Sequence, residues 1–268
     1  MNIFEALILG IVQGATEFLP VSSSGHLVLL RNIFGIHEPA LLFDTAVHGG
    51  TLIAVIVVLR QDILNILRRI FQPQTLYIIL ATIPLVIVAL VFRTQVEKAF
   101  TTGSLLGFAF LITSALLFLS DKLYKKTSDR PVRLQNEMTF KDALFIGALQ
   151  AAAIFPGVSR SGATISAGLL RRFDRDFAAR FAFLLSIPAI MGALVLQAKN
   201  LVTGATPDSA IGLVPIAVGT VTACIVAFFS IRLALKMVRE RRLKCFAVYT
   251  GILGIFVLID KFGTNIFF

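Results

Sequence analysis

Six apolar stretches that carry no charged side chain constrain this chain more than any other feature. A membrane-spanning helix needs about 17–25 mostly apolar residues. Hydrophobic residues make up 57% of the chain and charged residues 15%, whereas a soluble domain is about 45–50% apolar and about a quarter charged. The sequence therefore predicts an all-α integral membrane protein and excludes soluble, disordered and disulfide-scaffold folds. The six predicted transmembrane helices are Thr45–Leu59, Phe71–Phe92, Ala99–Ser120, Phe181–Ala198, Ser209–Ile231 and Cys245–Ile259.

Two further apolar segments, Ala6–Pro20 and Ala143–Pro156, differ from these six. Each is followed by a Ser/Gly-rich stretch and a second, shorter apolar run. Neither half is long enough to cross the bilayer, and irregular backbone at membrane depth is tolerated only where protein surrounds it. We expect two re-entrant helix–loop–helix hairpins.

The basic residues are distributed unevenly over the predicted loops. Of 25 Lys and Arg, 19 fall in four segments that the six-helix scheme places on one face, and five on the other. The positive-inside rule makes the first face cytoplasmic, with both termini on the outer side of the membrane. The net charge of +10 then reflects topology and contact with membrane lipids, and no nucleic-acid partner is expected. The four segments are 60–74, 121–142, 171–180 and 232–244.

The chain also contains an internal repeat. When it is shifted by 137 residues, residues 5–26 align with 142–163 without a gap, with 10 of 22 positions identical. This predicts a single membrane domain over 1–268, with halves at about 1–124 and 142–268 joined by a basic cytoplasmic loop, 121–141. Three spans per half is an odd number, so the halves are inverted and the hairpin tips meet near the midplane.

The two tips divide their polar residues. Glu17 and His26 lie on the first tip, and Arg160 of the second aligns with Ser23 of the first. Ionisable groups at membrane depth cost about 2.5–3.5 kcal/mol each on insertion scales, and they usually mark a functional site.

The residue types suit phosphoryl chemistry. Gln13 shares a helix face with Glu17, and Glu17, Ser23 and His26 are the parts of an activated nucleophile or an acid–base pair. Arg160 can grip phosphate oxygens in a bidentate manner, beside a helix N-terminus that favours anions. The other predicted phosphate-binding residues are Gly157, Ser159, Ser161, Gly162 and Thr164.

Other polar residues have simpler interpretations. His48 is expected to be a close-packing or cavity-lining residue, and Asp44 a helix cap or a polar lining residue. Ser22 and Ser24 are typical of packing positions in membrane helices.

Both tips match motifs of a known family. The run from Gln13 through Glu17-Phe-Leu-Pro-Val-Ser-Ser-Ser-Gly to His26, and the run Pro156-Gly-Val-Ser-Arg-Ser-Gly-Ala-Thr164, resemble the motifs of the bacterial undecaprenyl-diphosphate phosphatases, the bacitracin-resistance family. The resemblance covers essentially the whole chain. It implies hydrolysis of undecaprenyl diphosphate to undecaprenyl phosphate and inorganic phosphate, which recycles the carrier lipid of peptidoglycan and other wall polymers and confers bacitracin resistance.

The resemblance places Glu17, Ser23, His26 and Arg160 at proposed catalytic positions and leaves either Ser23 or His26 as the nucleophile. No tightly bound cofactor is expected. Binding of Mg²⁺ or Ca²⁺ with Glu17 as a ligand is left open. Gln13 stands where some family members carry Glu, so this chain has one carboxylate fewer for such an ion. A polyprenyl-phosphate transporter or flippase using the same site is the alternative function, and small residues such as Gly107 and Gly219 leave a homo-oligomer open.

Overall fold

A computed structural model describes residues 1–36, 41–103, 105–127, 131–202, 211–264 and 266. The described chain is helical, with no β-strand beyond one isolated bridge between Arg133 and Phe173. The helices are α1 (Ile3–Thr16), α2 (Ser23–Ile33), α3 (Leu41–Val58), α4 (Arg60–Arg68), α5 (Pro73–Val91), α6 (Arg93–Thr102), α7 (Leu106–Lys126), α8 (Phe140–Ala152), α9 (Arg160–Leu170), α10 (Arg175–Val202), α11 (Leu213–Arg239) and α12 (Leu243–Ile259), with a 3₁₀ turn at Gln135–Glu137 and a π-helical turn at Asp260–Thr264.

The predicted all-α membrane class is confirmed at the level of long apolar helices. Among the described residues, α5, α7, α10, α11 and α12 are long and apolar enough to cross a bilayer. A sixth span arises if α3 and α4, which meet at a bend of 76°, are counted as one. The protein is thus a multi-pass membrane protein with five or six apolar spans.

One predicted span is divided between two helices in the structure. The apolar stretch Ala99–Ser120 is divided between α6 and α7, because Gly103 adopts the left-handed conformation (φ 58°) that ends α6. Such a residue is a common helix terminator. The start of the stretch predicted at Ser209–Ile231 lies outside the described residues.

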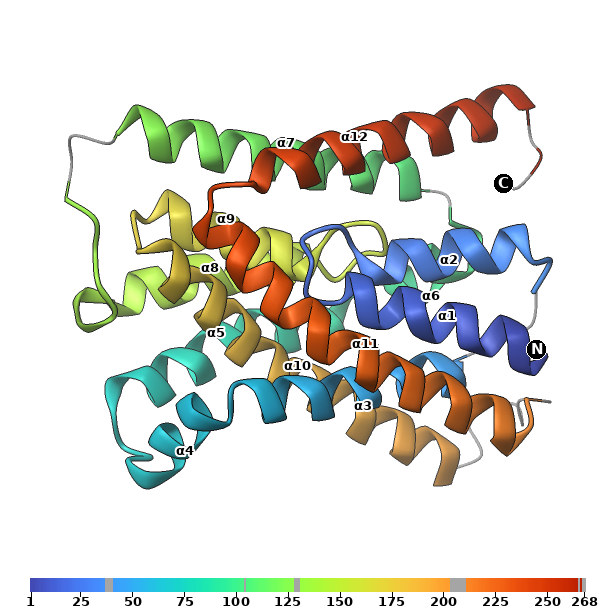
Figure 1. Ribbon diagram of the computed structural model, residues 1–268, viewed down its shortest axis with the longest axis horizontal. Helices are drawn as coiled ribbons and strands as arrows, with labels where there is room; N and C mark the ends of the chain where they lie inside the picture. The colour runs from blue at the N-terminus through green and yellow to red at the C-terminus, as the bar shows by residue number, and fades with distance from the viewer. Residues whose placement is uncertain (37–40, 104, 128–130, 203–210, 265, 267–268) are drawn as a thin grey trace.

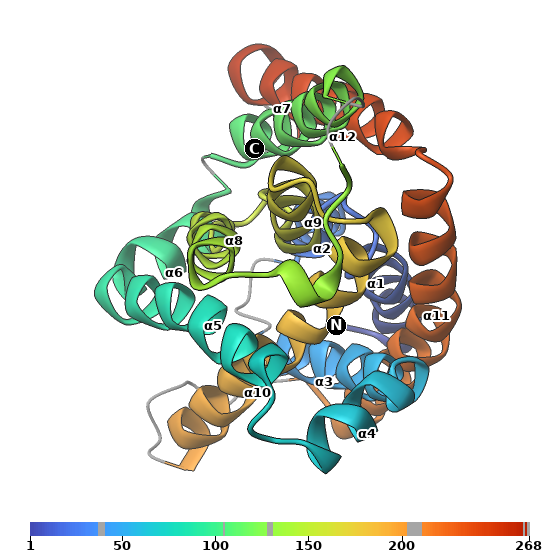
Figure 2. The same cartoon turned by 90° about the vertical axis from the view of Figure 1, so that its left-hand side faces the viewer.

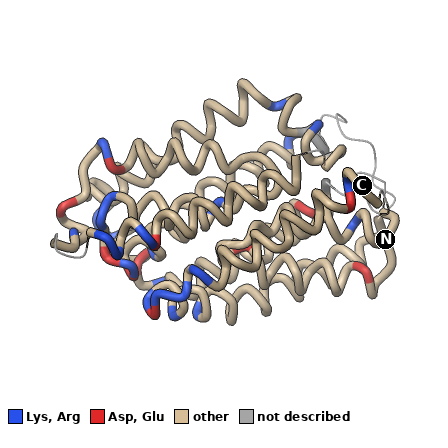
Figure 3. Tube along the Cα trace, turned by 90° about the horizontal axis from the view of Figure 1, so that it is seen from above, with Lys and Arg blue, Asp and Glu red and all other residues tan. Residues whose placement is uncertain are grey.

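Two helix–loop–helix units lie inside the bundle. Figure 1 shows α1–α2 and α8–α9 running inward from opposite ends, with their loops meeting in the middle and both termini at the same end. Viewed from one end, α2 and α9 are central, and α7, α12, α11, α3 and α5 surround them (Figure 2). Lys and Arg gather mainly at the end opposite the termini (Figure 3), here called the basic end, formed by 60–74, 121–127, 131–142, 171–180 and 232–244.

Both units begin with the same capping device. Asn2 caps α1 and Thr139 caps α8, and each forms a capping box with the acidic residue three positions later, Glu5 or Asp142. Each second arm is capped by a serine at its start, Ser22 for α2 and Ser159 for α9. These caps satisfy backbone N–H groups that a helix end leaves unpaired.

A glycine in each unit allows close packing on a helix from the other half of the chain. A Cβ on Gly10 of α1 would lie 2.5 Å from the backbone oxygen of Gly219 in α11, and one on Gly147 of α8 would lie 2.5 Å from that of Ala81 in α5. Backbones therefore approach within contact distance, as small residues permit in membrane proteins.

The two tips touch directly. A Cβ on Gly25 would lie 2.9 Å from the Cα of Gly157, whose φ of 95° itself favours glycine. Ser161 donates a hydrogen bond to the carbonyl oxygen of Leu19 at 3.2 Å. The contact between tips is therefore made by backbone as well as by side chains, which leaves little room for a larger residue.

At the basic end, Asp142 ties three segments together. Its buried carboxylate accepts hydrogen bonds from Arg133 of the loop before α8 (2.7 Å), from the Thr139 hydroxyl (2.7 Å) and from Arg171 after α9. Burial by itself raises the pKa of Asp142, but the hydrogen bonds from these groups outweigh it and hold the pKa well below its ordinary value.

We predict that Asp142→Asn destabilises the fold, because two arginines lose their anionic partner at a buried position. Removing one partner of a buried ion pair typically costs about 3–5 kcal/mol, so the unfolding midpoint in detergent should drop clearly. Glu240→Gln, which disturbs only solvent-exposed pairs with Lys236 and Arg242, is the matched control and should change the midpoint little. Equal midpoints for the two variants would contradict the assigned role of Asp142.

A second prediction concerns the tip contact. Gly25→Ala should lower both the unfolding midpoint and any activity of the site, because the added methyl would lie 2.7 Å from the Phe110 ring and 2.9 Å from Gly157. Overpacking of this kind typically costs about 1–3 kcal/mol. Gly49→Ala is the control, since its nearest neighbour there would be a Leu194 methyl at 3.6 Å. Unchanged stability in Gly25→Ala would show that the tips are not packed this closely.

Candidate active site

The carboxylate of Glu17 lies at the centre of the contact between the two tips. Its side chain is only 3% exposed. Gln13 Nε2 donates to Oε2 at 2.9 Å, the Ser23 hydroxyl donates to the same oxygen, and an Arg160 guanidinium nitrogen donates to Oε1 at 2.9 Å. The predicted residues Gln13, Glu17, Ser23 and Arg160 are therefore brought together from α1, α2 and α9.

Local backbone geometry places Ser23 against Glu17. The preceding residue, Ser22, has φ 70° and ψ 93°, a conformation that non-glycine residues rarely adopt. Its hydroxyl caps α2 by accepting from Gly25 N–H at 3.3 Å. Strain of this kind costs about 1–3 kcal/mol and is concentrated at functional sites. The reversal at Ser22 turns the chain so that the first residue of α2 faces the last turn of α1.

The second tip presents Arg160 from the first position of α9. Ser159 caps this helix by accepting from Gly162 N–H at 3.0 Å, and its own N–H donates to Thr113 Oγ1 of α7 at 2.9 Å. Thr164 donates back to the Arg160 carbonyl at 2.9 Å. The predicted phosphate-loop residues thus surround Arg160, and their hydroxyls already make hydrogen bonds that hold the tip. Their contact with phosphate stays a prediction.

His26 lies away from this cluster. Its Nδ1 is 2.7 Å from the Ser22 carbonyl oxygen, and its Nε2 is 2.7 Å from the Tyr249 hydroxyl of α12. The ring stacks on Tyr249 and meets the Phe110 ring edge-on. Among the described interactions, none joins His26 to Glu17 or Arg160. Both ring nitrogens are occupied, so His26 fixes α2 against α12 and α7 in this conformation.

A different histidine reaches Glu17. His48 of α3 places Nε2 3.5 Å from Glu17 Oε2, and its Nδ1 lies 2.6 Å from the Asp44 carbonyl oxygen. Asp44 in turn pairs with Arg31 at 2.6 Å. The sequence analysis placed His48 among packing or cavity-lining residues and did not connect it to Glu17. The spacing of Asp44, His48 and Thr51 on one face of an apolar helix was the available signal.

The described residues contain no group of three or more His, Cys, Asp or Glu side chains that could hold a metal ion. Both carboxylate oxygens of Glu17 already have protein donors. A contact of Mg²⁺ or Ca²⁺ with Glu17 therefore stays a prediction.

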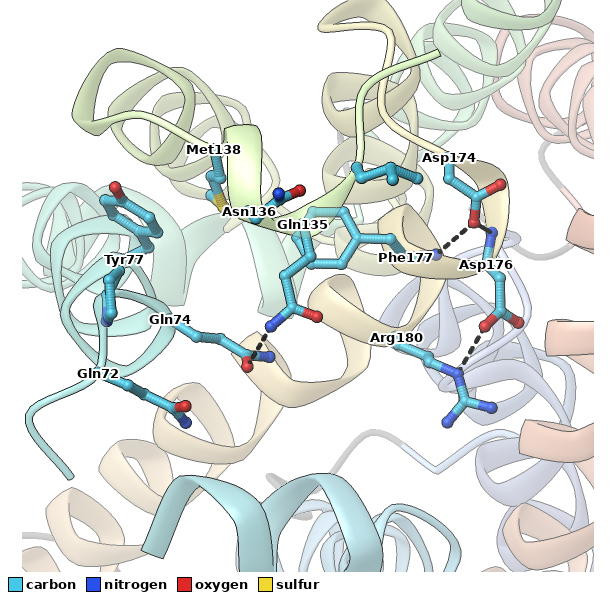
Figure 4. A pocket seen from close by; sticks show the side chains of 12 residues that line it. Gln72, Gln74, Tyr77, Gln135, Asn136, Met138, Asp174, Asp176, Phe177 and Arg180 are labelled. Carbon is cyan, nitrogen blue, oxygen red and sulfur yellow. Dashed lines mark hydrogen bonds and ion pairs between the residues drawn. The ribbon is translucent and has the colours of Figure 1, made fainter. Parts of the chain in front are cut away.

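A pocket of about 660 Å³ lies elsewhere, at the basic end between α5, the loop before α8 and α10. Figure 4 shows two pairs among its polar side chains: Gln135 donates to Gln74, and Arg180 pairs with Asp176. The cluster around Glu17 instead combines a carboxylate, a serine hydroxyl and a guanidinium.

Comparison with known proteins gives an independent result. The family model described as "Bacitracin resistance protein BacA" matches residues 6–256. The chain is 44% identical over 259 residues to an undecaprenyl-diphosphatase of Carboxydothermus hydrogenoformans, covering 97% of each chain. It is 41% identical to undecaprenyl-diphosphatase 3 of Bacillus cereus, covering 100% of each, and 38% identical over 283 residues to an undecaprenyl-diphosphatase of Methanobrevibacter smithii, covering 97% and 98%. This multi-pass membrane chain therefore belongs to the bacitracin resistance protein BacA family.

Proposed function

We propose that this protein hydrolyses undecaprenyl diphosphate to undecaprenyl phosphate and inorganic phosphate, and so recycles the carrier lipid for wall polymers and confers bacitracin resistance. The observation that carries the proposal is a buried carboxylate, Glu17, in contact with both a serine hydroxyl and an arginine. Relatives that match the whole chain are named undecaprenyl-diphosphatase.

In the proposed first step, the Ser23 oxygen attacks the terminal phosphorus of the diphosphate. The serine proton passes to Glu17 Oε2, which already accepts the hydrogen bond from this hydroxyl. The bond from that phosphorus to the bridging oxygen breaks, and undecaprenyl phosphate leaves with the bridging oxygen. Arg160 and the N-terminus of α9 stabilise the charge on the transferring group.

In the second step, water attacks the phosphoserine. The bond from phosphorus to the serine oxygen breaks, one water proton stays on the departing phosphate, and the other passes through Glu17 to the serine oxygen. The proton that Ser23 gave up in the first step is released to solvent, one in each turnover. His26 supports α2 in this scheme and does not attack phosphorus, because its two nitrogens are held by Ser22 and Tyr249.

The fold is proposed to be an inverted repeat with two re-entrant hairpins. Equivalent positions, 137 residues apart, carry the helix caps Asn2 and Thr139 and the packing glycines Gly10 and Gly147. Each hairpin packs on a helix of the other half, as expected for interlocked inverted halves. The tips, and hence Glu17 and Arg160, would then lie near the midplane.

The proposed location is the bacterial inner membrane, with the basic end in the cytoplasm and both termini outside. The gathering of Lys and Arg at the end opposite the termini supports this orientation (Figure 3). The site is proposed to open to the outer side, because α2 ends and α3 begins at the end that carries the termini (Figure 1), where Arg31 and Asp44 pair the two helices. Both His48 and Arg160 are partly exposed.

Phosphate release from undecaprenyl diphosphate in detergent tests the reaction. We expect Ser23→Ala and Glu17→Gln each to lower kcat by ~100-fold or more, since nucleophile and base are removed. Ser114→Ala is the matched control, because its hydroxyl donates to a backbone carbonyl of α12, outside the site, and should retain activity. After a quench in neutral denaturant, which preserves both phosphoserine and phosphohistidine, the phosphorylated peptide should contain Ser23; near-normal rates in Ser23→Ala, or phosphate on His26, would refute the nucleophile assignment.

Labelling of intact cells with a membrane-impermeant maleimide tests the orientation. In a background with Cys224→Ser and Cys245→Ser, we expect Phe262→Cys near the C-terminus to label and Lys126→Cys at the basic end to label only after permeabilisation. Both positions are exposed in the structure, so access from each side of the membrane decides the outcome. The reverse pattern would invert the proposed topology.

A further inference from the structure

A histidine from outside both hairpins is directed at the proposed base. His48 belongs to α3, and its Nε2 lies 3.5 Å from Glu17 Oε2, the oxygen that also accepts from Ser23. The reaction described above places the serine proton on Glu17 and releases it to solvent, but it names no group that carries the proton between the two. The His48 imidazole is the titratable group next to the oxygen on which that proton arrives.

The hydrogen bonding of the ring defines its tautomer. Nδ1 of His48 is 2.6 Å from the Asp44 carbonyl oxygen, and a carbonyl oxygen only accepts, so Nδ1 carries the hydrogen. In the neutral imidazole, Nε2 then has a lone pair directed toward the carboxylate. Two lone pairs facing each other repel, so a proton between Nε2 and Oε2 is needed to make the contact favourable.

We infer that His48 is a positioning residue that acts through Glu17. Its Nε2 shares a proton with the Glu17 carboxylate and takes up the proton that Ser23 releases. The carboxylate is thereby restored before water attacks. The inference rests on the proposed function. The 3.5 Å separation is longer than an ordinary hydrogen bond, as is common for catalytic contacts before substrate binds. The side chain is 22% exposed, so the ring can pass its proton to solvent, whereas Glu17 is enclosed.

The surroundings of His48 contain few other groups that titrate or carry charge. Glu17 from α1 faces the ring, with Arg160 of α9 on the far oxygen of that carboxylate. On α3 itself Asp44 is neutralised by Arg31 of α2. The two glycines that follow His48 pack against two further helices. Their neighbours are Leu194 of α10 and backbone atoms of Thr220 and Cys224 of α11. Of these three residues, only Cys224 has a side chain that titrates.

Replacement of His48 tests the inference through readouts that a packing role would not change. We expect His48→Gln, which keeps a polar side chain but cannot carry a proton, to lower kcat by ~10–100-fold, with KM changed less than about threefold because Arg160 and the second tip are untouched. The pH dependence of the rate should also differ between His48→Gln and wild type, because the glutamine side chain cannot carry a proton.

Imidazole rescue provides the second variant. Added imidazole should restore at least part of the activity of His48→Ala, whose missing ring leaves a partly exposed space, and should not restore Ser23→Ala. Thr51→Val is the matched control on α3: the Thr51 hydroxyl bonds the His48 carbonyl oxygen at 2.8 Å, so this variant disturbs the backbone at His48 but keeps the ring, and we expect activity within about twofold of wild type.

The outcomes separate the two hypotheses. If wild type releases no phosphate from undecaprenyl diphosphate, the proposed function fails. If wild type is active and His48→Gln keeps its kcat and its pH profile, only the inference about His48 is overturned. Loss of activity in His48→Ala without imidazole rescue, together with an equal loss in Thr51→Val, also overturns it, because α3 packing would then explain both.

Discussion

The structure depends on one buried negative charge that must be compensated. Glu17 is enclosed within an apolar bundle, where an unpaired carboxylate would be very unfavourable. Arg160, 143 positions later in the chain, supplies the opposite charge at 2.9 Å. Because the two residues lie on different hairpins, the ion pair forms only when the tips meet. The site requires both halves of the chain and is thereby coupled to the completed fold. If either partner is removed, the other is left as an uncompensated buried charge, which is strongly destabilising.

The residues that the two helix–loop–helix units share serve the frame, and those that differ are the ones proposed to carry the chemistry. Ser22 and Ser159 cap their second arms in the same manner. The aligned positions that follow them hold Ser23 and Arg160, which both contact Glu17. Gln13 fits this division of roles, because its amide donates to Glu17, whereas a second carboxylate there would repel Glu17 and need another cation. With Gln13 neutral, Arg160 balances the charge of Glu17, so the site carries no surplus negative charge that would repel an anionic diphosphate.

Sequence patterns predicted the parts of this protein that depend on local chemistry. The apolar lengths identified the spans, and the aligned tips identified Gln13, Glu17, Ser23 and Arg160, because spacing along one hairpin determines which side chains share a face. The break between α6 and α7 was missed, since Gly103 acts through a left-handed backbone that composition does not show. The partners of His26 and His48 were missed as well. Tyr249 lies 223 positions from His26, and periodicity within a helix carries no information on which helices become neighbours.

The two histidines show why position in a motif does not by itself define a chemical role. Each donates from Nδ1 to a carbonyl oxygen four residues earlier, so both have the same tautomer and differ only in what Nε2 meets. For His26 it meets the Tyr249 hydroxyl, a donor that satisfies the lone pair and leaves the ring a structural link between helices. For His48 it meets the carboxylate of Glu17, an acceptor that leaves the lone pair unsatisfied until a proton arrives. The histidine inside the motif is therefore chemically saturated, and the one outside it is the ring whose state must change when Glu17 gains or loses a proton.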